Sequence, residues 1–109
     1  MEYRLSDTDR ELIQTAAREV FLAIILTSGD LKITAADATA YPGHADWITK
    51  DQIPLESVAG AFSFIVKNGH VTGFFPSSGL NRGPDWKLED SELRTILKLL
   101  PLSPDFRMY

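Results

Sequence analysis

Cysteine is absent from the sequence, and bases are outnumbered by acids, with 11 Lys and Arg residues against 15 Asp and Glu residues. Without cysteine the chain has no disulfide, no thiolate nucleophile and no cysteine-bound metal. The net charge of −4 argues against a basic, phosphate-neutralising surface. We therefore expect no nucleic-acid partner.

Long hydrophobic runs are also lacking. The most apolar run extends from Val20 to Leu26 and has seven residues, whereas a membrane-spanning helix needs ~20. The first residues contain no basic stretch leading into an apolar one, which a secretory signal would show. We expect a cytoplasmic protein with no membrane contact.

Catalytic motifs are missing as well. No Lys-Ser or Lys-Thr pair follows a glycine-rich loop, and neither the dinucleotide-binding glycine pattern nor a Gly-x-Ser-x-Gly elbow occurs. The two histidines are far apart in the sequence and do not form a metal-binding pair on a helix. We assign no catalytic residue, no cofactor and no metal, and an enzyme is the less favoured class.

Enough apolar material is present for one globular domain. The chain has 109 residues, of which 44% are hydrophobic and 24% are charged. This length favours a single domain spanning residues 1–109. Residues 1–54 contain nine acids and five bases, so the excess of acid lies in this half, either for solubility or as an acidic face for a basic partner.

The apolar periodicity predicts a long helix over residues 6–28. Ser6 is a good N-cap, and Asp7, Asp9 and Glu11 suit the positive end of a helix dipole. One helical face carries apolar side chains at the expected spacing: Ile13, Ala16, Ala17, Val20, Phe21 and Ile24. The second half is apolar almost all round, which predicts burial on several sides.

The strongest local signal is a β-hairpin over residues 61–75. Asn68-Gly69 is the preferred pair for a two-residue type I′ turn. With such a turn, Val66 faces Val71 and Phe64 faces Gly73. The core face then carries Phe62, Phe64, Val66, Val71 and Phe75, and the opposite, mixed face carries Ser63, Ile65, Lys67, His70, Thr72 and Phe74.

The remaining segments complete an α+β fold. Leu31–Thr34 is a candidate strand, and residues 35–60 give no clear pattern. Residues 76–87 are predicted as an exposed loop, residues 89–100 as a helix that Pro101 ends, and residues 101–109 as a tail. The expected fold is a small antiparallel sheet built around the hairpin, with the long N-terminal helix and the C-terminal helix packed on one face.

Two sets of residues are candidates for a site. His44, Asp46 and Trp47 follow a Pro-Gly turn, and a histidine within reach of a carboxylate suits a ligand-binding or general-base role. In the loop 76–87, glycines expose backbone amides beside a guanidinium, which is typical of recognition sites. There Ser78, Asn81, Arg82 and Trp86 are the candidate partner-binding residues.

Two classes of function remain open. Small size, acidity and the lack of a catalytic motif favour a protein–protein interaction module, such as an inhibitor, an immunity protein or an accessory protein. The alternative is a small-molecule binder or enzyme with a pocket near His44, Asp46 and Arg82. Surplus apolar surface on residues 6–28 predicts a homodimer, unless Phe106, Met108 and Tyr109 dock the tail over it.

Overall fold

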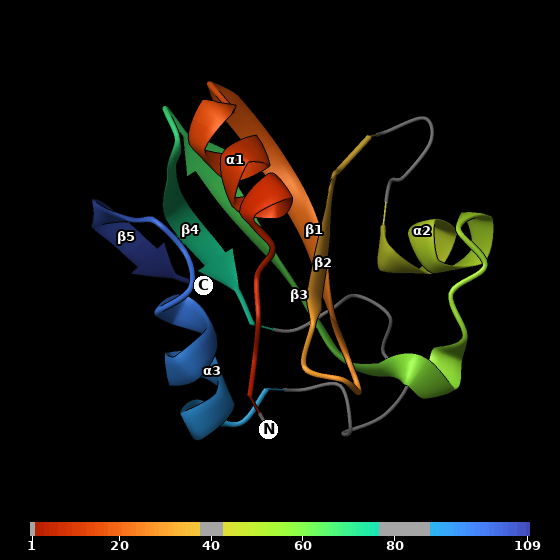
Figure 1. The fold of residues 1–109 in the computed structure, drawn as a ribbon. Coiled ribbons are helices and arrows are strands. Elements are labelled where there is room, and N and C mark those ends of the chain that lie inside the picture. Colours follow the sequence, from red (N-terminus) through yellow and green to blue (C-terminus); the bar gives the residue numbers. More distant parts are fainter. Residues whose placement is uncertain (1, 38–42, 77–87) are drawn as a thin grey trace.

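The computed structural model describes residues 2–37, 43–76 and 88–109. Within these ranges, one five-stranded sheet is combined with three α-helices and a short 3-10 helix (Figure 1). In chain order the elements are α1 (Asp7–Thr15), β1 (Arg18–Leu26), β2 (Leu31–Ala35), α2 (His44–Lys50), η1 (Leu55–Ser57), β3 (Val58–Lys67), β4 (His70–Phe75), α3 (Asp90–Leu97) and β5 (Leu102–Met108). The α+β class is therefore confirmed.

The sheet is mixed, with the strand order β2-β1-β3-β4-β5, so the expectation of an antiparallel sheet was wrong at the β5 edge. The first three pairings are antiparallel, and β4 pairs with β5 in parallel. The expectation of a tail over residues 101–109 was wrong, because this segment returns through α3 as an edge strand. Parallel neighbours need such a crossover, and Pro104 is tolerated in β5 because an edge strand has one unpaired side.

The long helix predicted over residues 6–28 was also wrong. Only α1, of nine residues, is helical, and the Ser6 hydroxyl caps it by accepting from the Asp9 amide at 3.1 Å. The chain then enters β1, which lies between β2 and β3 and is buried on both faces from Phe21 to Ile25. A strand buried on both faces is a continuous apolar run, and such a run satisfies the helical spacing equally well.

The hairpin turn is confirmed and is anchored to the rest of the chain. Asn68 has φ 50° and Gly69 has φ 79°, as a type I′ turn requires. The Asn68 amide donates to the Ala17 carbonyl at 2.7 Å, and the Gly69 amide donates to the Ala16 carbonyl at 2.9 Å. The turn is thus fixed to the link between α1 and β1.

The register of the hairpin is confirmed only next to the turn. Val66 pairs with Val71 as expected, but an irregularity at Thr72 shifts the remaining pairs by one residue. Phe64 therefore pairs with Phe74 instead of Gly73. The expectation that Phe75 lies on the core face was wrong: Phe74 lies there, fully buried, because the extra residue reverses the alternation beyond it.

One sheet face, the helix-packed face, is covered by α1 and α3. Ile13 of α1 and Ile96 of α3 are both fully buried against it. The helix predicted over residues 89–100 is present as α3 but ends at Leu97, and the Glu92 carboxylate accepts from the Glu89 amide at 3.2 Å at its start. The buried strand residues of this core are Phe21, Ala23, Ile25, Leu31, Ile33, Phe62, Phe64, Val66, Val71 and Phe74.

The opposite sheet face, the split face, is covered over one half only. There α2 packs Trp47 and Ile48 against β1 and β3, in a second apolar cluster completed by Leu22, Ile24, Val58 and Ala61. In Figure 1, α2 stands beside the end of the sheet away from the hairpin turn. Among the described residues, no helix has the length and apolar character of a membrane span.

Candidate functional site

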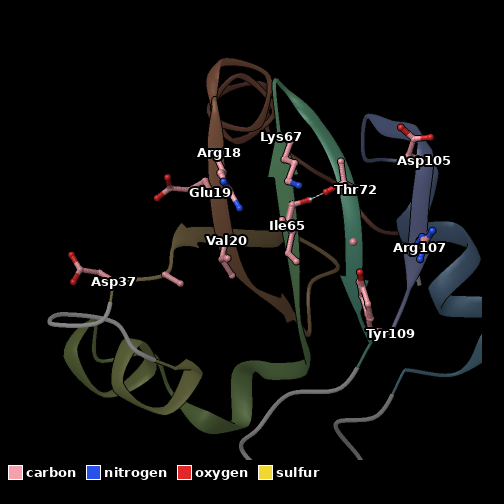
Figure 2. A pocket seen from close by; sticks show the side chains of 12 residues that line it. Arg18, Glu19, Val20, Asp37, Ile65, Lys67, Thr72, Asp105, Arg107 and Tyr109 are labelled. Carbon is pink, nitrogen blue, oxygen red and sulfur yellow. Dashed lines mark hydrogen bonds between the residues drawn. The ribbon is translucent and has the colours of Figure 1, made fainter.

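The half of the split face that α2 leaves uncovered forms a hollow of about 980 Å³, which we call the open groove (Figure 2). Residues from four strands and from the segment after β2 line it. They are Arg18, Glu19, Val20, Ala36, Asp37, Ile65, Lys67, Thr72, Gly73, Asp105, Arg107 and Tyr109. Seven of these twelve are exposed, so the groove is a shallow surface feature rather than an enclosed cavity.

The floor of the open groove is aliphatic. Val20 of β1 pairs directly with Ile65 of β3, and Ile65 pairs with Gly73 of β4. Val20 is 44% exposed, whereas the same strand buries Leu22 and Ile24 under α2. The apolar row therefore continues from the covered half into the open half, where no described element of the chain covers it.

An aromatic wall closes the β5 side of the groove. The Tyr109 ring stacks on Phe75 with a centroid separation of 4.9 Å and an interplanar angle of 15°. It also lies over Gly73, where an added Cβ would be only 2.8 Å from Tyr109 Cε2. The Tyr109 amide donates to the Phe74 carbonyl at 2.8 Å. The ring is thus held in place yet 63% exposed.

Charged side chains surround this floor. Arg18 and Lys67 extend over the groove from adjacent strands, and Arg107 lies across from them on β5 (Figure 2). The acids Glu19, Asp37 and Asp105 also belong to the lining. The one ion pair between described residues joins Arg4 to Asp30, at 2.9 Å and away from the groove. Arg18, Lys67 and Arg107 therefore form no ion pair with a described carboxylate.

His44 lies outside the open groove, at the start of α2. Its side chain is buried, and Nε2 lies 2.7 Å from the Phe62 carbonyl oxygen and 3.1 Å from the Ala23 carbonyl oxygen. Burial lowers the pKa of His44, against the opposing effect of these two carbonyls. A neutral imidazole donating from Nε2 satisfies this arrangement, and it fastens α2 to β1 and β3.

The structure separates the other two residues of the candidate ligand site. Trp47 is buried beneath α2, and its Nε1 donates to the Asp51 carboxylate at 2.9 Å. Asp46 is exposed on the same helix. None of His44, Asp46 and Trp47 lines the open groove, and their ligand-binding role stays a prediction.

The other candidate residues lie outside the described part of the chain. Ser78, Asn81, Arg82 and Trp86 fall in residues 77–87, and their partner-binding role stays a prediction. Within the described ranges, no group of three His, Cys, Asp or Glu side chains is placed to hold a metal ion.

Sequence reasoning missed the groove as a site. The hairpin pattern did place Ile65, Lys67 and Thr72 together on the mixed face. It could not add Arg18 and Val20, because they were assigned to a helix, or Tyr109, because it was assigned to a tail. The usable signal was the β-branched and aromatic content of residues 20–26, which favours a strand.

Comparison of the chain with protein-family models, with curated proteins and with solved structures finds no match. Its function is therefore inferred from its own residues and their geometry.

Proposed function

We propose that this chain is a small acidic protein–protein interaction module, of the inhibitor, immunity or accessory type, that binds its partner in the open groove. The main supporting observation is the uncovered half of the split face, where no described residue covers the floor of Val20 and Ile65. The other half of the same face is covered by α2. A partner protein that extends this cover would bury the exposed floor.

The composition of the groove supports a protein partner. Protein interfaces combine an apolar centre with a polar rim and are rich in Tyr and Arg. The open groove has an aliphatic floor, an exposed Tyr109 ring, and Arg18 and Arg107 at its margins. Small-molecule sites, in contrast, bury most of the ligand surface, which a lining of mostly exposed residues does not favour.

The homodimer predicted from the sequence has less support from the structure than a different protein partner has. It was predicted from surplus apolar surface on residues 6–28, and Leu22 and Ile25 of this segment are buried within the chain. Met108 and Tyr109 are exposed at the β5 edge, at 43% and 63%. A second copy is therefore one partner that the test of the groove must be able to detect.

Site-specific photocross-linking tests the proposal. A benzophenone amino acid replaces Val20 in the groove or, as the matched control, Leu12 on α1; the two native side chains are 44% and 48% exposed. We expect a distinct protein to be cross-linked in source cells from position 20 and not from position 12. Equal products from both positions, or none from position 20, would contradict the proposal, and a cross-linked second copy would identify a homodimer.

A further inference from the structure

Arg18 and Lys67 form an unfavourable pair within the free chain. They stand directly opposite each other on β1 and β3, and like charges in this cross-strand position are destabilising. Lys67 is in turn opposite His70 on β4, so basic residue types occupy three neighbouring strands in one row. No described carboxylate forms an ion pair with Arg18 or Lys67.

The nearby acids of the groove do not neutralise this row. Glu19 pairs with Val66, which belongs to the helix-packed face, so its position alternates away from that of Arg18. Asp105 lies on β5, with β4 between it and Lys67. Asp37, the third acid of the lining, follows β2, with β1 between it and Lys67. Although the chain is acidic overall, the row itself contains only basic residue types.

An aliphatic surface lies directly beside the two cations. The pair of Val20 and Ile65 is two residues further along the same two strands than the pair of Arg18 and Lys67. Residues i and i+2 of a strand are separated by about 7 Å on one face. A ligand that spans both pairs therefore needs a negative group and an apolar group about that far apart. Side chains two residues apart in an extended peptide supply this spacing.

We infer that the partner segment bound in the open groove is acidic: it places an Asp or Glu carboxylate between Arg18 and Lys67 and an aliphatic or aromatic side chain on Val20 and Ile65. This inference rests on the proposed function and specifies the partner's chemistry. A free inorganic anion would meet the cations alone and leave the aliphatic floor in water. A peptide segment satisfies both parts of the surface.

Selection from a random peptide library displayed on phage, with the full chain as the target, tests the inference. We expect enriched peptides to carry Asp or Glu two residues away from a Leu, Ile or aromatic residue. A synthetic copy of an enriched peptide should bind Arg18→Glu/Lys67→Glu at least tenfold more weakly, since contacts to charged groups are lost. The control Arg94→Glu/Lys98→Glu changes the net charge equally on exposed residues of the α3 region and should bind normally.

A second variant distinguishes a loss of peptide binding from a loss of folding. Arg18→Gln/Lys67→Gln removes the like-charge pair, so its melting temperature should equal or exceed that of the wild type while its peptide affinity falls. Wild-type affinity should also decline between about 0.05 and 0.5 M salt, because screening weakens contacts between exposed charges. If the melting temperature fell together with the affinity, the two cations would stabilise the fold rather than bind the partner, and the inference would be contradicted.

Three results would overturn the inference: enriched peptides without acidic residues, acidic peptides that bind the charge-reversed variant equally well, or no enrichment at all. These results are distinct from failure of the proposed function. A protein cross-linked at position 20 together with neutral or basic peptides would preserve the interaction module and refute the acidic segment.

Discussion

The helix-packed face and the split face are formed by alternate residues of the same strands, yet they are covered to different extents. On the first face α1 and α3 bury Phe62, Phe64 and Phe74 completely. On the second face α2 covers one half and leaves Val20 exposed in the other. The two faces therefore differ in how much they contribute to the buried core, and substitutions on neighbouring residues can separate stability from the proposed recognition.

The largest difference in the free energy of unfolding is expected between substitutions of two adjacent residues of β3. Phe64 is fully buried and stacks on Phe21 at 5.4 Å, so Phe64→Ala should lower the free energy of unfolding by roughly 3–5 kcal/mol. Ile65 is only partly buried in the groove, and Ile65→Ala should cost about 1 kcal/mol. Denaturant unfolding of both variants measures this difference, and equal losses would mean that the open groove is part of the core.

A second contrast separates the two halves of the split face along β1. Ile24 is fully buried under α2, whereas Val20 is 44% exposed. Ile24→Ser should cost about 3 kcal/mol through a cavity and a buried hydroxyl, while Val20→Ser should change stability by less than about 0.5 kcal/mol. If Val20→Ser were as destabilising in thermal or denaturant unfolding, some other part of the chain would have to cover the groove.

A substitution in the hairpin turn tests how α1 is fixed beside the sheet. Gly69 has a positive φ, and a Cβ added there would be 2.5 Å from the Gln14 carbonyl oxygen. Gly69→Ala should therefore cost about 2 kcal/mol, because backbone strain and a main-chain clash add. Asn68→Gly, with φ 50° at the neighbouring position, is the control and should be nearly neutral in the same unfolding experiment. A neutral Gly69→Ala would show that α1 is not held against the turn.

A smaller effect depends on pH and concerns the covered half. Burial lowers the pKa of His44 below its ordinary value of 6.5, so the unfolded chain binds the proton at a higher pH than the folded chain. The stability linked to this group is thus complete above pH 6.5 and is lost as the pH falls below it. The slope cannot exceed about 1.4 kcal/mol per pH unit.

Urea unfolding between pH 7.5 and 5.5 measures this slope. His44→Gln should flatten the pH dependence, whatever its effect on stability at neutral pH. His70→Gln removes the other histidine of the chain, which is exposed, and provides the matched control. A slope that persists in His44→Gln would assign the titration to another group.

Elements with strong local signals could be predicted from the sequence. Asn68-Gly69 between β-branched and aromatic residues indicated the hairpin, and Ser6 indicated the start of a helix at residue 7. The bulge at Thr72 could not be predicted, because no local rule distinguishes it from regular pairing. It decides that Phe74 lies in the core and that Phe75 supports Tyr109 instead.

By itself the sequence determined the α+β class, the hairpin turn and the identity of most core-forming segments, because these depend on local conformational preference and apolar content. Only the tertiary structure decided that residues 18–26 are a central strand, since burial on both faces removes the alternation that marks a strand. The tertiary structure also decided which residues form the groove. Arg18, Lys67 and Tyr109 are far apart in the chain, and strand pairing and register bring them to one surface.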